Sequence, residues 1–203
     1  MPNILFLFVV IIVLSTVHGY VILRILPAFG FSNNLSWFLI VLICFFSALP
    51  ILPPILRMIG YENKLIDKFS LIGYTSFGFF SFTFMIFLFR DFFLQATQLI
   101  ETLIRDSAPI DTSKRDFLIK ASSLAIIGSS GISTAYGFYN SRKGPSIVNQ
   151  DVFLNNLPQE FEDFTIAQIS DLHVGPTIKK PYVLKVLEEI SRINPDIIAV
   201  TGD

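Results

Sequence analysis

Four long apolar stretches decide what this 203-residue chain can fold into. They cover about residues 4–23, 36–55, 69–89 and 117–136. Each is about as long as the roughly 20 residues that an α-helix needs to cross the hydrocarbon core of a bilayer. Because backbone polar groups in lipid must be satisfied within the segment, we expect four transmembrane helices within residues 1–139. The lipid bilayer is therefore a predicted partner.

The composition agrees with a membrane location. Hydrophobic residues make up 52% of the chain, 22 residues are Phe, and only 15% are charged, whereas about a quarter are charged in an average soluble domain. The formal net charge of −1 and the absence of a basic stripe argue against nucleic-acid binding. The single cysteine, Cys44, excludes an intrachain disulfide.

The first stretch favours a transmembrane helix over a cleaved signal peptide. No basic residue precedes it, and no small-residue cleavage site follows it. His18 lies inside this stretch. We interpret it as a partnered or interfacial histidine, with a proton relay as the alternative for an ionisable group in a membrane.

Prolines and an amphipathic pattern mark the next two stretches. Pro50, Pro53 and Pro54 predict a kink or a helix end near Leu49, because proline removes a backbone donor. Beyond Arg90, apolar residues recur at helical spacing, so this segment either continues the third helix into water or lies at the membrane interface. Residues 107–109 are expected to end it.

The fourth stretch is rich in small residues and follows a basic segment. The octet 113–120, Ser-Lys-Arg-Asp-Phe-Leu-Ile-Lys, resembles a twin-arginine export signal with Lys114 in place of the first arginine. An ordinary basic flank of a membrane helix is the alternative. Basic residues are balanced between the two sides, and only Lys120 favours a cytoplasmic position for the octet. The part after Tyr136 is then expected outside.

Soluble character begins at a predicted linker, residues 140–163. A strand at 164–170 opens into Asp171-Leu172-His173, an amphipathic helix is expected over 180–194, and a strand at 197–200 opens into Thr201-Gly202-Asp203. A strand, a helix and a second strand of this length predict parallel pairing through a crossover. The carboxyl ends of both strands then lie at one edge of the sheet.

Metal ligands follow both predicted strands. Asp171 and His173 are two residues apart, and on an extended backbone such residues project to the same side, where both could contact one ion. The Asp203 carboxylate has two oxygens and could bridge that ion to a second one. Gly202 allows close approach of the backbone. Asp171, His173 and Asp203 are therefore the candidate metal ligands.

Residues 164–203, with these two motifs on either side of the helix, resemble the start of a calcineurin-like metallophosphoesterase domain. They are most similar to the membrane-anchored bacterial type. The resemblance implies two divalent ions, Mn, Fe or Zn, with Asp171 and His173 on the first metal and Asp203 bridging both. The remaining ligand motifs and the general acid of that family lie outside this chain. We therefore expect an N-terminal fragment with an incomplete α/β domain and no catalytic residue, inactive by itself.

The predicted function is a membrane-anchored, metal-dependent phosphoesterase in the bacterial inner membrane, with the phosphoesterase part on the periplasmic side. Its substrate is a phosphomonoester or phosphodiester, and a lipid-linked ester is one candidate. The alternative is a non-enzymatic multispanning protein, either a transporter or an assembly subunit. A transporter should show paired broken helices or several intramembrane charges. By sequence, only His18 and the proline cluster qualify.

Overall fold

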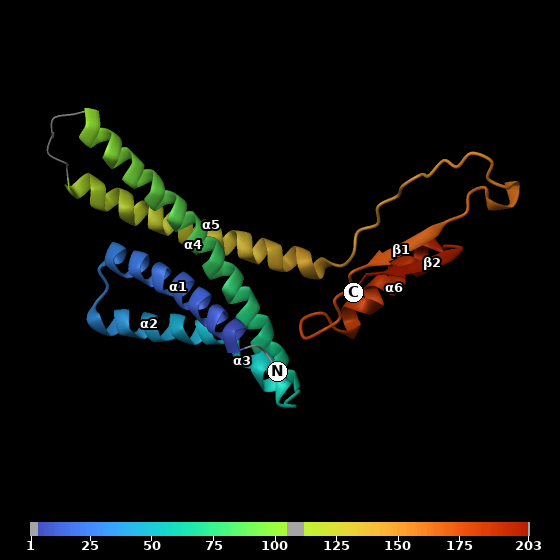
Figure 1. Ribbon diagram of the computed structural model, residues 1–203, viewed down its shortest axis with the longest axis horizontal. Coiled ribbons are helices and arrows are strands. Elements are labelled where there is room, and N and C mark those ends of the chain that lie inside the picture. Colours follow the sequence, from blue (N-terminus) through green and yellow to red (C-terminus); the bar gives the residue numbers. More distant parts are fainter. Residues whose placement is uncertain (1–3, 105–111, 203) are drawn as a thin grey trace. The chain divides into compact units, whose positions relative to one another are not determined.

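The computed structural model describes residues 4–104 and 112–202, which form a mostly helical chain with one small sheet (Figure 1). It divides into two compact units, Met1–Tyr136 and Gly137–Asp203. The helices of the first unit are α1 (Ile4–Phe29), α2 (Asn33–Ala48), α3 (Leu52–Met58), α4 (Lys64–Ile104) and most of α5 (Thr112–Lys143). The second unit contains a short 3-10 helix, η1 (Gln159–Phe161), then β1 (Ile166–Ser170), α6 (Lys180–Ile193) and β2 (Ile197–Thr201).

Among the residues that the structure describes, four segments are long and apolar enough to cross a membrane, one for each predicted span. The second is the pair of helices α2 and α3, taken together as Asn33–Met58. Helix α4 has 41 residues, so the amphipathic segment beyond Arg90 continues the third helix. Its predicted end at residues 107–109 lies outside the described residues. Helix α5 extends to Lys143, four residues into the predicted linker.

The breaks between helices have identifiable local causes. Gly30, at φ 60°, follows α1 and donates its N–H to the Leu26 carbonyl. Helix α2 ends at Ala48, next to the predicted Leu49. Pro53 and Pro54 then lie in the first turn of α3, where a missing N–H costs no hydrogen bond. Asn63 caps α4 by accepting the backbone N–H groups of residues 65 and 66 at 3.0 and 2.9 Å.

The core of the helical unit lies where α1, α2 and α4 meet. Val17 and Val21 of α1 pack with Ile43 of α2 and Phe80 of α4. His18 is 2% exposed, its Nδ1 lies 2.8 Å from the Leu14 carbonyl oxygen, and its ring centroid is 4.5 Å from that of Phe80. One ring nitrogen of His18 is therefore partnered within the bundle, in agreement with our interpretation, while its buried Nε2 has no hydrogen-bond partner among the described residues.

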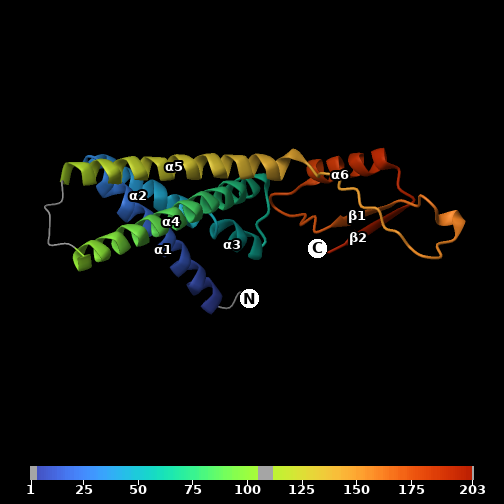
Figure 2. The same cartoon turned by 90° about the horizontal axis from the view of Figure 1, so that it is seen from above.

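The second unit contains the predicted strand–helix–strand arrangement. Strands β1 and β2 pair in parallel, from Ile166 opposite Ile197 to Ser170 opposite Thr201, and α6 lies beside them (Figure 2). Helix α6 ends where predicted, because Asn194 takes the left-handed conformation and donates its N–H to the Ile190 carbonyl. The parallel pairing is therefore confirmed.

A single glycine allows α4 to pass close to the end of α2. A Cβ atom at Gly73 would lie 2.6 Å from the carbonyl oxygen of Leu49 and 2.7 Å from its carbonyl carbon. Both are backbone atoms and cannot move aside like a flexible side chain. Gly78, five residues further along α4, has nothing within 4 Å of a Cβ at that position.

We expect Gly73→Ala to destabilise the helical unit by about 1–3 kcal/mol, because the added methyl group must push two backbones apart. The measurement is thermal unfolding of the detergent-solubilised chain. Gly78→Ala is the matched control, since it makes the same change in helix propensity without a collision. Equal melting temperatures for the two variants would show that the close approach at Gly73 is not needed for stability.

Candidate metal-binding edge and a polar cluster among the helices

The ends of β1 and β2 lie together at the carboxyl edge of the sheet. Ser170 pairs with Thr201, and the Asp171 N–H donates to the Thr201 carbonyl at 3.3 Å. Asp171 and Gly202 are thus the first residues beyond each strand, and they are direct neighbours. The sequence motifs that we selected as metal ligands begin at this edge.

The carboxylate of Asp171 lies directly against Gly202. A Cβ atom at residue 202 would be 2.9 Å from Asp171 Cγ and 3.1 Å from its backbone nitrogen. The backbone of Gly202 also has φ 81°, a conformation that other residues rarely adopt. Both the space and the conformation therefore require glycine, and the carboxylate is held next to the residue that precedes Asp203.

The backbone after β1 is not extended, which corrects one of our premises. Asp171 has φ 50° and His173 has φ 47°, so both are in the left-handed region. The alternation of an extended strand therefore cannot be used to place their side chains on the same side. A loop follows, closed by a hydrogen bond from the Gly175 N–H to the Ile178 carbonyl at 3.0 Å. Left-handed non-glycine residues are uncommon and gather at functional sites.

Two of the three predicted ligands lie within the described residues. Asp171 offers carboxylate oxygens and His173 an imidazole, donors that suit Mn, Fe or Zn. Asp203 lies outside the described residues. Among residues 4–104 and 112–202, no group of three or more His, Cys, Asp or Glu side chains forms a metal site. The three-residue ligand set therefore remains a prediction.

The acidic residue Asp196 has a structural role at the other end of the two strands, where they begin. Its carboxylate accepts the Thr165 N–H at 2.8 Å, and its own N–H donates to the Thr165 carbonyl at 3.0 Å. These two bonds tie the chain before β1 to the chain before β2. Asp196 thus sets the start of the pairing that brings Asp171 to Gly202.

Curated relatives carry metallophosphoesterase names. A zebrafish transmembrane protein with metallophosphoesterase domain is 26% identical over 68 residues, which is 34% of this chain and 16% of the relative. Its bovine namesake is 24% identical over 136 residues, 66% of this chain and 30% of the relative. An uncharacterised metallophosphoesterase of Helicobacter pylori is 30% identical over 67 residues, 33% of this chain and 17% of the relative. No family model and no solved structure matches.

These comparisons support the metallophosphoesterase family at low identity over about a third of the chain. The chain spans less than a third of the length of these relatives. The bovine match is longer than the whole second unit, so it includes part of the helical unit as well. Together with the four apolar segments, the transmembrane names point to a membrane location.

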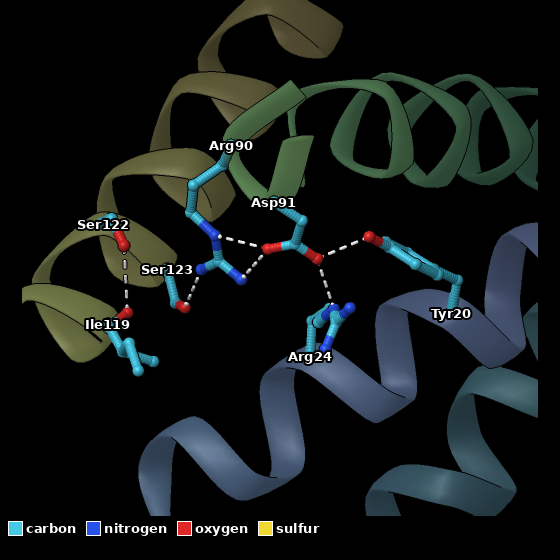
Figure 3. Close-up of polar contacts among 7 residues, drawn as sticks. All are labelled: Tyr20, Arg24, Arg90, Asp91, Ile119, Ser122 and Ser123. Atoms are coloured by element: carbon cyan, nitrogen blue, oxygen red, sulfur yellow. Dashed lines mark hydrogen bonds and ion pairs between the residues drawn. The ribbon is translucent and has the colours of Figure 1, made fainter. Parts of the chain in front are cut away.

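A group of polar and charged side chains lies among the helices and is centred on Asp91 of α4 (Figure 3). Its carboxylate accepts the Tyr20 hydroxyl at 2.5 Å and lies 2.5 Å from Arg24 Nε, both on α1. The other carboxylate oxygen accepts Nε and a terminal nitrogen of Arg90 at 3.0 and 2.8 Å. Asp91 is 8% exposed. It therefore pairs with two guanidinium groups and one hydroxyl inside the bundle.

The same cluster reaches α5. The remaining terminal nitrogen of Arg90 donates to the Ser123 hydroxyl at 2.9 Å, and Ser123 is fully buried. The Arg90 guanidinium also stacks 4.7 Å from the centroid of the Phe87 ring, and that of Arg24 lies 4.9 Å from the Tyr20 ring. We call Tyr20, Arg24, Arg90, Asp91 and Ser123 the Asp91 cluster. It connects α1, α4 and α5.

Sequence reasoning missed the Asp91 cluster, because we counted Arg24 and Arg90 only as flanks of separate spans. A signal was present on α4. Phe80, Phe84, Phe87 and Asp91 recur at spacings of 4, 3 and 4 residues, so they lie along one face of the helix. Phe80 contacts His18, Phe84 contacts Tyr20, and Asp91 contacts Arg24, all on α1. The face that packs on α1 therefore ends in a carboxylate.

We expect Gly202→Ala to displace Asp171, because the methyl group would overlap its carboxylate and the positive φ would be strained. The expected result is an increase of about tenfold or more in hydrogen exchange at the Asp171 amide, which bonds to Thr201. Gly175→Ala is the control, since the nearest atom to its Cβ is the His173 carbonyl oxygen at an ordinary 3.7 Å. Unchanged exchange in Gly202→Ala would contradict the close contact.

We expect Asp91→Asn to destabilise the helical unit, because two guanidinium groups would lose their counter-charge. The cost should be about 1–3 kcal/mol, below that of a fully buried pair since Arg24 is partly exposed. Thermal unfolding in detergent measures it. Asp116→Asn, on the exposed side of α5, is the matched control, and a loss of similar size in that variant would mean that the cluster contributes nothing particular.

Proposed function

We propose that this chain is the membrane-anchoring and first ligand-bearing part of a metal-dependent phosphoesterase. The observation that carries the proposal is the contact of the Asp171 carboxylate with Gly202, the residue that precedes Asp203. Parallel strand ends are where α/β proteins bind their ligands. The metallophosphoesterase names of the relatives agree with this chemistry.

In this proposal, Asp171, His173 and Asp203 would hold two divalent ions, Mn, Fe or Zn, with Asp171 and His173 on the first ion and Asp203 shared by both. When bound, such a pair supplies a hydroxide at neutral pH and stabilises the charge on the phosphoryl oxygens. The residues of this chain have simpler tasks. Asp171 offers carboxylate oxygens, His173 offers an imidazole nitrogen, and Gly202 leaves room for the Asp171 carboxylate at the end of β2.

The proposed substrate is a phosphomonoester or a phosphodiester, and a lipid-linked ester suits a membrane-anchored enzyme because the anchor holds the site near headgroups. We propose the bacterial inner membrane as the location, with residues 164–203 on the periplasmic side. An alkaline phosphatase reporter fused after residue 163 should then be active. A green fluorescent protein fused there should be dark, and the opposite pattern would reverse the orientation.

We further propose that this chain does not turn over substrate alone. Its only histidines are His18 and His173, and His18 lies in the core of the helical unit. The second metal and the general acid would therefore need residues from outside this chain. The curated relatives are several times longer and leave room for such residues.

We expect the protein expressed with all that its gene encodes to hydrolyse bis-p-nitrophenyl phosphate in the presence of Mn²⁺. Residues 1–203 alone should not. Asp171→Asn should lower kcat by about a hundredfold or more, because it removes a metal ligand, and a chelator should abolish turnover. Asp151→Asn, at an exposed position of the linker, is the matched control. Full activity of Asp171→Asn, or turnover by residues 1–203 alone, would overturn the respective proposal.

A non-enzymatic membrane role is the second candidate, and the Asp91 cluster favours it. Charged residues within membrane helices are rare and commonly mark function, and the structure brings three charged residues together near the ends of the predicted spans, Arg24, Arg90 and Asp91. The two candidates make opposite predictions for one pair of variants. A transporter or assembly subunit keeps its cellular phenotype in Asp171→Asn and loses it in Asp91→Asn.

A further inference from the structure

The Asp91 cluster carries more positive than negative charge. Two guanidinium groups, Arg24 and Arg90, face one carboxylate. Their side chains are 38% and 14% exposed, and that of Asp91 is 10% exposed. One positive charge is therefore left without a counter-charge within the cluster. Arg90 and Asp91 are largely removed from water, whereas Arg24 is more than a third exposed. An anion that contacts Arg24 would balance this charge.

The two arginines of the Asp91 cluster make different contacts. Arg90 engages Asp91 through two nitrogens and Ser123 through the third. Arg24 approaches Asp91 through Nε. That atom is buried, so the exposed 38% of the Arg24 side chain lies in its other atoms. The two terminal nitrogens of a guanidinium can bind a phosphate with two parallel hydrogen bonds.

The depth of Arg24 in a membrane helix can be derived from helix geometry. The first candidate span begins at Leu5, and at a rise of 1.5 Å per residue Arg24 lies about 28 Å along the axis. The hydrocarbon core is about 30 Å thick. Arg24 therefore lies near the boundary between the hydrocarbon core and the headgroups when the core begins at Leu5. Lys120, one turn before Ser123 on α5, adds a further basic residue near the same end.

We propose that the Asp91 cluster binds the phosphate of an anionic phospholipid headgroup, with Arg24 as the residue that contacts it. Asp91 and Tyr20 hold the Arg24 guanidinium in place, and Arg90 supplies the excess charge. A lipid phosphate is the anion that is always present at this depth, and an anionic lipid matches the net positive charge of the cluster. This binding site is independent of the phosphoesterase proposal, because it uses residues of the helical unit only.

The test is lipid binding by the full chain in delipidated detergent micelles, followed by native mass spectrometry. Phosphatidylglycerol should bind several-fold more tightly than phosphatidylcholine. Arg24→Gln should weaken phosphatidylglycerol binding about tenfold, the size expected for a lost charged hydrogen bond. Circular dichroism shows whether Arg24→Gln folds. If it does not, Arg24→Lys is the second variant. It keeps a positive charge beside Asp91 but lacks the two-nitrogen donor of a guanidinium, so it should also weaken binding.

Arg115→Gln is the matched control, because it removes the same charge from an exposed position near the same end of α5. It should change binding by less than about threefold. Equal losses in Arg115→Gln and Arg24→Gln would overturn the proposal in favour of diffuse charge attraction. Equal binding of the two lipids would also overturn it. Displacement of phosphatidylglycerol by millimolar inorganic phosphate, with the same dependence on Arg24, would overturn the proposal that a lipid is the ligand and would indicate free phosphate instead.

Discussion

The parallel pairing of β1 with β2 is the interaction on which the candidate metal-binding edge depends. Asp171 and Gly202 are about thirty residues apart in the chain, and only this pairing makes them neighbours. The pairing is set at its start by the two hydrogen bonds between Asp196 and Thr165. It ends with the Asp171 N–H on the Thr201 carbonyl. A shift of one residue would move every side chain of a strand to the other face, and Asp171 would lose its place beside Gly202.

Much of this arrangement could be predicted from local sequence signals. The lengths of the apolar stretches predicted the four candidate spans, the prolines after Leu49 predicted the end of α2, and the amphipathic pattern over 180–194 predicted α6. Each of these signals acts within a few residues of the structure that it specifies. The conformations of Asp171 and His173 could not be predicted in this way. A left-handed non-glycine residue is held by contacts that surround it, such as the pairing of a distant strand, and not by its own preference.

The Asp91 cluster was beyond local prediction for a related reason. Tyr20 and Asp91 are 71 residues apart, and their contact requires α1 and α4 to run side by side in the same direction. The sequence showed an arginine near the end of one apolar stretch and an Arg-Asp pair near the end of another. Either could have been an independent flank in contact with headgroups and water. Only the packing of Phe80 on His18 and of Phe84 on Tyr20 sets the register that brings the charges together.

The ratio of two arginines to one aspartate in the Asp91 cluster distinguishes a structural role from a binding role. One arginine would be enough to neutralise Asp91 and to link α1 with α4, as Arg57 does when it pairs with Asp67 between α3 and α4 at 2.7 Å. A second arginine adds a link to Ser123, but a neutral donor on α4 could make the same hydrogen bond. What only a second guanidinium adds is a positive charge. Because the Arg90 side chain is only 14% exposed, its charge is largely removed from water, and a structure that needed only the links would be more stable without it. The excess charge is therefore best explained by an anion that completes the cluster in the membrane.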